Sequence, residues 1–299
     1  MPDQNVELRW SVEQRLEFIE FRLFWEGKVR RADLVDEFGI SVPQASADIQ
    51  RYDGMAKGNI EYDASAKTYV IGAAFKPLFL KPSARRYLNY LRSIADGVLR
   101  ADEVWLSWMP SFDVVPLVRR KLDASKLRRV LEAIRHRLSV KIEYQSMRRP
   151  EPTTRQISPH ALGFDGFRWH ARAWCHARRE FRDFVLARVI SISKAPPSDI
   201  DPKHDIAWHH YIVHKIGPHP RLAAGARKAI ELDYGMRDGI LEIRTRVCLS
   251  FYLMRHLRLD LAALELDPAQ QQIVLLNADD VARQQEQRHS VGSDVAGAI

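Results

Sequence analysis

Cysteine is scarce in this sequence, which limits how the fold can be stabilised. The 299 residues include only two cysteines, Cys175 and Cys248. They lie far apart in the chain and belong to no Cys-x-x-Cys pair, which excludes a disulfide framework and a cysteine-ligated zinc site. We therefore expect two reduced thiols packed within the fold.

Long apolar runs are missing as well. No stretch of about 18 apolar residues occurs, so the sequence predicts no membrane-spanning helix. The start of the chain, Met1 to Gln4, lacks the basic and apolar regions of a secretory signal. We expect a cytoplasmic protein that has no membrane partner.

The motifs of common catalytic sites are also absent. The sequence has no phosphate-binding glycine loop, no Gly-x-Ser-x-Gly elbow and no His-Glu-x-x-His pair. A nuclease would need acidic metal ligands near its basic residues, and Glu143, Asp165 and Asp183 form no recognisable constellation. We therefore predict that the protein is not an enzyme and that it has no cofactor.

A cluster of histidines suggests a metal site, but the spacing argues against one. The four residues are His209, His210, His214 and His219. On an extended strand His210 and His214 share a face but lie roughly 13 Å apart, which is too far to bind one ion. We predict no metal site.

Basic residues are concentrated in the middle of the chain. The net charge is +8, and residues 119–188 carry 18 basic against 7 acidic side chains, whereas residues 1–75 carry 9 against 13. This distribution indicates a polyanionic partner for the central region. The length favours two or three domains. We predict four regions: a DNA-binding domain at 1–75, a helical connector at 76–124, a ligand-sensing barrel at 125–195 and a C-terminal extension at 196–299.

The first 75 residues have the pattern of a winged helix-turn-helix. A capping box at Ser11 predicts the start of a first helix that ends near Trp25, and a second helix covers residues 31–38. Gly39 permits a sharp turn, after which Ser41 caps a third helix with Val42, Ala45, Ile49 and Tyr52 on its buried face. Strands at 59–62 and 67–70 then form a hairpin, which is the expected position of a wing.

The outward face of the third helix is the candidate for reading DNA. Gln50 and Arg51 are the preferred base-contacting residues, and cations around the helices and the wing would contact phosphates. The full predicted DNA-binding set is Arg30, Arg31, Ser41, Gln44, Ser46, Gln50, Arg51, Lys57 and Lys67. A helix-turn-helix can instead bind proteins, and the acidic balance of residues 1–75 favours that alternative.

From Val140 onward the apolar period changes from helical to alternating, which indicates a small β-barrel. Four segments carry a resemblance to the WYL domain, a family with an Sm-like barrel: Ile142-Glu-Tyr-Gln-Ser, Arg155-Gln-Ile-Ser-Pro-His-Ala-Leu-Gly, Phe167-Arg-Trp-His-Ala-Arg-Ala-Trp-Cys and Phe181-Arg-Asp-Phe-Val-Leu-Ala-Arg-Val-Ile. The family's Trp-Tyr-Leu is Trp169-His-Ala here, and Ala187 replaces its usual Asp.

Within that family, the whole chain is similar to repressors that accompany phage-defence systems such as BREX and CBASS. The C-terminal segments starting at Trp208 and at Ile230 resemble the extension of that group. The resemblance implies an α+β multidomain protein with an N-terminal winged helix-turn-helix, a central Sm/SH3-like WYL β-barrel and a C-terminal α+β dimerisation domain. It also implies a homodimer that binds an inverted-repeat DNA operator.

The resemblance further implies a ligand-binding set: Tyr144, Ser146, Arg155, His160, His170, Arg172 and Arg188. Arginines would bind phosphate bidentately and rings would stack on a base, so the expected effector is a nucleotide or an oligonucleotide. Any single arginine could equally be solvated or paired with an acid, and Trp169 is more often a core residue than a ligand contact.

These observations favour a homodimeric repressor of a phage-defence operon, relieved when a nucleotide or nucleic-acid ligand binds the central domain. The alternative is an RNA- or single-stranded-DNA-binding protein that uses the basic barrel and has no transcriptional role. The segment after Pro196 is expected to alternate strands and helices and to mediate pairing of two chains, with a frayed tail after Glu286.

Overall fold

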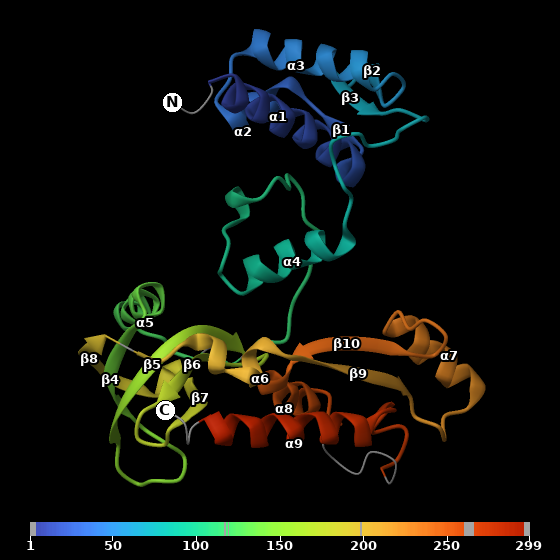
Figure 1. The fold of residues 1–299 in the computed structure, drawn as a ribbon. Helices are drawn as coiled ribbons and strands as arrows, with labels where there is room; N and C mark the ends of the chain where they lie inside the picture. Colours follow the sequence, from blue (N-terminus) through green and yellow to red (C-terminus); the bar gives the residue numbers. More distant parts are fainter. Residues whose placement is uncertain (1–3, 117, 119, 198, 260–265, 296–299) are drawn as a thin grey trace. The chain divides into compact units, whose positions relative to one another are not determined.

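The computed structural model describes residues 4–116, 118, 120–197, 199–259 and 266–295. The chain folds as two compact units, residues 1–117 and residues 118–299 (Figure 1). Each unit has apolar cores of its own. None of the described helices is both long and apolar enough to cross a membrane.

The N-terminal unit starts with the predicted winged helix-turn-helix. Its elements are α1 (Gln4–Glu26), β1 (Lys28–Val29), α2 (Arg31–Phe38), α3 (Val42–Met55), β2 (Ile60–Asp63) and β3 (Thr68–Ile71). Helix α1 begins at Gln4 and not at the predicted Ser11, which lies inside it. Gly39 has a φ of 62°, the left-handed conformation that the turn between α2 and α3 needs. The hairpin pairs with β1 in the order β1-β3-β2, which confirms the wing.

Much of the predicted connector belongs to this N-terminal unit. Helix α4 (Ala84–Ala95) and the short 3₁₀ helix η1 (Ala101–Glu103) follow the wing. Leu80 and Leu91 share a buried cluster with Phe21 of α1, and the Trp105 ring contacts both Phe18 and Phe21 edge-on. The segment after the wing therefore packs on the back of the first helix.

A buried carboxylate fixes that packing. Glu20 is fully buried and accepts hydrogen bonds from the backbone N–H groups of Leu78, Phe79 and Leu80 at 2.7, 2.7 and 2.6 Å. The Tyr52 hydroxyl donates to the same carboxylate at 3.1 Å. Burial raises the pKa of Tyr52 far above its usual value, so this hydroxyl stays a donor. One side chain thus connects α1, α3 and the segment that follows the wing.

The central domain is a five-stranded antiparallel sheet in the order β7-β6-β5-β4-β8. The strands and their preceding and connecting helices are α5 (Ala124–His136), β4 (Leu138–Tyr144), β5 (Thr153–Phe164), β6 (Trp169–Cys175), β7 (Glu180–Val185), η2 (Leu186–Arg188) and β8 (Val189–Pro197). Helix α5 covers one face, where Val130 and Ala133 pack with Ile142, Ile157 and Ala173. The strand-rich domain predicted from the alternating pattern is confirmed.

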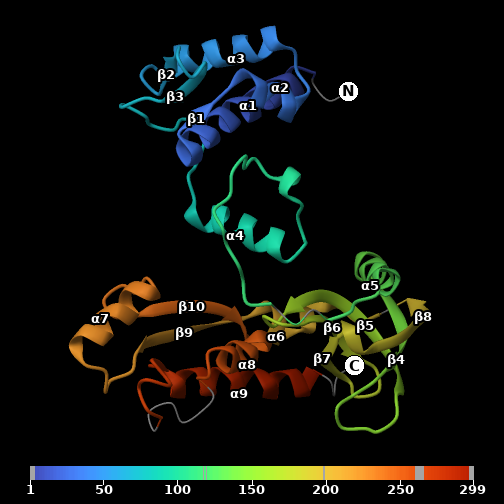
Figure 2. The ribbon, with the colours of Figure 1, turned by 180° about the vertical axis from the view of Figure 1, so that it is seen from behind.

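The C-terminal part has the predicted mixture of strands and helices. Its elements are η3 (Pro202–His204), α6 (Ile206–His209), β9 (Tyr211–Pro218), α7 (Ala224–Asp233), β10 (Leu241–Arg246), α8 (Val247–His256), β11 (Ile273–Leu275) and α9 (Ala278–Val295). The strands form a sheet in the order β10-β9-β11. Figure 2 shows α8 and α9 on the same side of β9. Helix α9 extends to Val295, and the fraying expected after Glu286 stays a prediction.

Candidate functional site

Helix α3 presents a polar outer face. Ser41 caps the helix, and its hydroxyl accepts a hydrogen bond from the Gln44 N–H at 3.3 Å. Gln50 and Arg51 are exposed and have no side-chain partner within the described part of the chain. Val42 is 56% exposed, so the prediction that it is buried is wrong. An exposed aliphatic side chain at the start of a recognition helix can contact a thymine methyl group.

Two of the thirteen acidic residues at 1–75, Glu20 and Asp48, are buried, whereas others such as Asp36, Glu37 and Glu61 are exposed. Asp48 is buried on the inner side of α3, where the Arg15 guanidinium donates to it at 2.6 Å. Glu20 is used by the backbone contacts described above. Asp53 remains exposed near the C-terminal end of the helix. Of the two acidic residues of α3, Asp48 therefore contributes no exposed carboxylate to the outer face.

The flanking cations differ in how free they are. Arg31, Lys57 and Lys67 are exposed and make no ion pair among the residues that the structure describes. Lys67 lies in the tight turn of the wing, where its φ is 52°. Arg30 is paired with Asp33 at 3.2 Å, and Asp33 also faces Arg22 at 3.4 Å. Arg30 is therefore the least available of the predicted phosphate contacts. Ser46 is half-buried on the same helix face as Gln50.

The seven predicted ligand residues do not gather in one place, because they lie on two faces of the central sheet. Tyr144 follows Ile142 on the face that packs against α5, and the strand register places Arg155 opposite Ile142. His170 and Arg172 alternate with the core residue Ala171 and so point to the other face. A single pocket cannot use all seven.

On the α5 face the predicted residues are partly structural. Tyr144 is a core residue whose ring meets Phe184 edge-on, and its hydroxyl accepts a hydrogen bond from the Val185 N–H at 3.2 Å. Ser146 and Arg188 lie close to the same end of β4, where the Gln145 N–H donates to the Arg188 carbonyl. Both are half-buried. These two residues remain accessible to a ligand, whereas the Tyr144 ring is packed in the core.

The other face carries a buried ionic network. Arg172 is 7% exposed and donates to both carboxylate oxygens of Asp205, at 2.7 and 2.9 Å, and to Asp183 at 3.2 Å. His160 Nε2 lies 2.9 Å from the same Asp205. Despite the cost of burial, hydrogen bonds from Arg172 and His160 lower the pKa of Asp205 to about 2. No pattern in the sequence indicated Asp205, although its carboxylate binds two of the predicted ligand residues.

A second buried carboxylate holds His170. His170 Nε2 lies 2.9 Å from Asp165, which also accepts hydrogen bonds from Arg168 Nε at 2.8 Å and from the backbone N–H of Phe167 at 2.8 Å. The ring of His170 packs against Tyr252 of α8. Hydrogen bonds from His170, Phe167 and Arg168 outweigh burial and keep the pKa of Asp165 well below its usual value. His170 is therefore a packed residue between the sheet and the C-terminal part.

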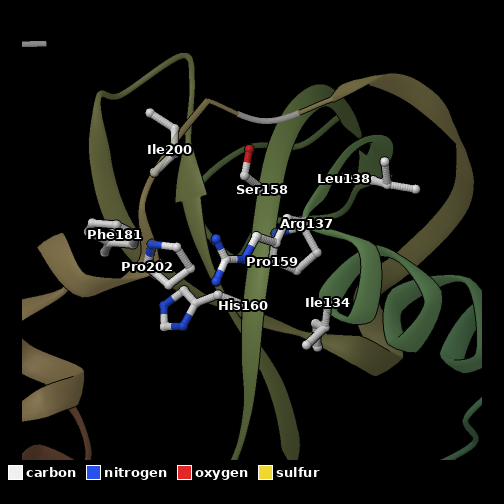
Figure 3. A pocket seen from close by; sticks show the side chains of 9 residues that line it. All are labelled: Ile134, Arg137, Leu138, Ser158, Pro159, His160, Phe181, Ile200 and Pro202. Atoms are coloured by element: carbon white, nitrogen blue, oxygen red, sulfur yellow. The ribbon is translucent and has the colours of Figure 1, made fainter.

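Two cavities open beside this network. The larger, about 790 Å³, lies between the sheet and the C-terminal helices and is lined by Arg172, Asp205, Tyr252 and the exposed Phe251, together with the turn residues Arg178 and Arg179. The smaller, about 220 Å³, contains Arg137, Ser158 and His160 between the apolar walls of Pro159 and Phe181 (Figure 3). A volume of 790 Å³ is within the range of small-molecule sites.

Sequence reasoning missed several residues of this region. Arg178 and Arg179 are exposed on the β6–β7 turn and make no ion pair within the described residues. Trp169 is 50% exposed and stacks on Phe164 with ring centroids 4.9 Å apart, so the expectation of a core residue is wrong. Paired arginines on a strand turn were the only signal available in advance. The contact partners on α6 and α8 lie too far along the chain to be inferred.

Comparison with known proteins supports each part of this architecture. Residues 11–93 match the winged helix-turn-helix domain of the BrxR transcriptional regulator, residues 125–193 match the WYL domain, and residues 214–281 match the C-terminal dimerization domain of BrxR. A winged helix, a WYL domain and a dimerization domain in this order define a transcriptional regulator of the WYL class.

Similarity to curated proteins extends over almost the whole chain. A DNA-binding transcriptional repressor CapW of Stenotrophomonas maltophilia is 42% identical over 276 residues, which is 92% of each chain. A repressor of the same name from Escherichia coli (strain KTE188) is 39% identical over 273 residues, 91% of each chain. The solved proteasome accessory factor B/C of Arthrobacter aurescens is 15% identical with a TM-score of 0.26, covering 94% of this chain and 48% of that one. The chain belongs to the CapW family of WYL-domain transcriptional repressors.

Proposed function

We propose that the protein is a homodimeric repressor that binds an inverted-repeat operator of a phage-defence operon through the outer face of α3. The observation that carries this proposal is the polar face with Gln50 and Arg51 exposed and Asp48 turned inward onto Arg15. The relatives are named as DNA-binding repressors, and residues 214–281 match a dimerization domain. Two copies of the winged helix would then contact two half-sites.

We further propose that a nucleotide or nucleic-acid fragment bound at the WYL domain lowers operator affinity. Arg172 and His160 converge on one carboxylate, and a guanidinium that binds a carboxylate with two hydrogen bonds also suits phosphate. The adjoining cavity of about 790 Å³ adds exposed aromatic and cationic side chains in Phe251, Arg178 and Arg179. Relief of repression requires the ligand to bind the two states of the dimer with different affinity.

Fluorescence anisotropy with duplex from the protein's own upstream region tests the operator claim. Scrambled duplex of the same length serves as the competitor, and the titration is repeated across a salt series. We expect a preference for the upstream duplex that persists at moderate salt, because base contacts add to the salt-sensitive phosphate term. Equal and steeply salt-dependent binding to both duplexes would refute sequence-specific recognition.

Two arginines provide a matched pair for the same assay. Arg51→Ala removes an unpaired cation on α3 and should weaken operator binding by about tenfold or more, the range of one base or phosphate contact. Arg30→Ala removes a cation already paired with Asp33 and should have a smaller effect. If Arg30→Ala costs as much as Arg51→Ala, the assignment of α3 as the reading helix is wrong.

A second candidate function uses the basic charge of the central region and has no role in transcription. The excess of 18 basic over 7 acidic residues at 119–188 favours a protein that binds RNA or single-stranded DNA through the WYL region. In that case single-stranded competitor would displace duplex completely, and Arg51→Ala would leave binding unchanged. The operator titration therefore separates the two functions.

A further inference from the structure

Asp205 lies where the central sheet meets the C-terminal part of the chain. It is 1% exposed, and it stands between η3 and α6, outside the strands that carry its partners. Arg172 of β6 binds its two oxygens at 2.7 and 2.9 Å, and His160 of β5 reaches it at 2.9 Å. The Asp205 carboxylate, which comes from the C-terminal part of the chain, thus occupies the position beside Arg172 and His160 of the sheet.

The same carboxylate also organises α6. Asp205 Oδ1 accepts a hydrogen bond from the Trp208 N–H at 3.2 Å, so it caps the helix while it binds Arg172. The Trp208 ring packs edge-on against His160, and the Arg246 guanidinium of β10 lies 4.4 Å from the centroid of that ring. Contacts that begin at Asp205 therefore continue to an outer strand of the C-terminal sheet.

The segment around Asp205 also separates the two cavities. Pro202 and His160 line the cavity of about 220 Å³, whereas Asp205 and Ile206 line the cavity of about 790 Å³. Phe181 borders both. Residues 202–206 thus contribute to both cavities, of which one is lined by His160 and the other by Arg172.

We propose that Asp205 is an internal competitor of the anionic effector. A phosphate group of the ligand takes its place on Arg172 and His160, and the freed carboxylate stops capping α6. The guanidinium then keeps its hydrogen-bonding geometry, because carboxylate and phosphate both present two oxygens to the fork. The change reaches β10 through Trp208 and Arg246. This inference rests on the proposed function, since it describes how the same ligand site is regulated.

Two isosteric variants of the full-length homodimer test the competition. Asp205→Asn removes the charge and replaces one of the two acceptor oxygens by an NH₂ group, which cannot accept from Arg172 and so loosens the side chain that caps α6. Asp183→Asn removes the charge of the other carboxylate beside Arg172, and Asp183 belongs to the sheet itself. The probe is 5′-phosphorylated tetrathymidylate, with the unphosphorylated tetramer as its control, titrated calorimetrically. We expect Asp205→Asn to bind the phosphorylated probe more tightly than wild type by about tenfold, the order expected for one charge-assisted hydrogen bond.

Hydrogen exchange separates displacement of Asp205 from a general electrostatic effect. In wild type and in Asp183→Asn the probe should accelerate exchange of the amides of Trp208, His209 and His210, because α6 loses its cap. In Asp205→Asn these amides should exchange faster before any probe is added, and the probe should change them little. A purely electrostatic role would make the two variants behave alike in both measurements.

The outcomes distinguish failure of this inference from failure of the proposed function. If wild type binds the probe and Asp205→Asn binds it equally or more weakly, the competition is refuted while ligand sensing stands. If Asp205→Asn binds more tightly and the probe releases operator from neither protein, the competition holds and ligand-controlled repression fails. If none of the three proteins binds the phosphorylated probe, the anion site and its competitor are both refuted.

Discussion

Replacing Glu20 by glutamine should destabilise the N-terminal unit far more than its single lost charge suggests. One carboxylate oxygen accepts from Leu78 N–H and the Tyr52 hydroxyl, and the other accepts from the N–H groups of Phe79 and Leu80. In Glu20→Gln an NH₂ group must face at least one of these donor pairs. Hydrogen bonds to charged groups are worth roughly 1.5–3 kcal/mol each, so losing two costs about 3–6 kcal/mol.

Differential scanning calorimetry of the full chain measures this cost. A unit of this size loses roughly 4 °C of melting temperature per kcal/mol, so the transition of the N-terminal unit should fall by about 12–24 °C. The transition of the C-terminal unit should stay in place, since Glu20 contacts only residues of its own unit within the described chain.

Glu17→Gln on the same helix is the control. Its partner Arg86 lies 3.7 Å away, and the two side chains are 31% and 56% exposed, so the expected loss is below about 1 kcal/mol. Equal shifts for Glu20→Gln and Glu17→Gln would refute the claim that the buried carboxylate anchors residues 78–80.

Three further predictions concern pH, packing and capping. The pKa of Asp205 is lowered to about 2 in the folded state, so its ionisation contributes about 2 kcal/mol to the free energy of unfolding above pH 4. This stabilisation is lost as the pH falls towards 2. Thermal melting between pH 5 and 2 should therefore show a fall in the stability of wild type that Asp205→Asn lacks. Gly163→Val should lower the melting temperature of the C-terminal unit, because a Cβ at this position would lie 3.3 Å from Leu249, and Gly163→Ala should cost less; equal melting of both would contradict the tight fit. Ser41→Ala should cost about 1 kcal/mol in chemical unfolding, with Ser41→Asn near wild type because asparagine also caps, and an unchanged midpoint for Ser41→Ala would exclude the cap.

The N-terminal unit was the most predictable part, because its signals are local. Glycine in the turn, a serine cap three residues before Gln44 and a hairpin after the third helix fix the winged helix within a few residues. The predicted start of α1 was wrong for a local reason as well. The capping-box pattern at Ser11 suggested a helix start, but a serine can also lie inside a helix, and α1 begins at Gln4. Exposure of Val42 could not be read from periodicity, because position 42 is the first residue of α3 and precedes its buried stripe.

The ligand region was less predictable because its geometry depends on contacts across long stretches of chain. Strand alternation correctly separated His170 and Arg172 from Ala171, but the set taken from resemblance mixes residues of both sheet faces. The partner of Arg172 lies 33 residues away at Asp205. No pattern in the sequence relates a helix-capping aspartate to an arginine in a preceding sheet, so this pairing required the structure.

The absence of a side chain at Gly163 has a consequence for how such proteins can recombine during evolution. Leu249 and Trp208 of the C-terminal part lie 3.3 and 3.9 Å from the position where a Cβ would be. A WYL sheet that carries a larger residue there would fit this C-terminal part only after Leu249 shifts, and a sheet without a partner for Asp205 would leave that carboxylate buried and unpaired. The central and C-terminal regions would therefore be inherited and exchanged together, whereas the winged helix, which forms a separate unit, could be replaced to give the same sensor a new operator.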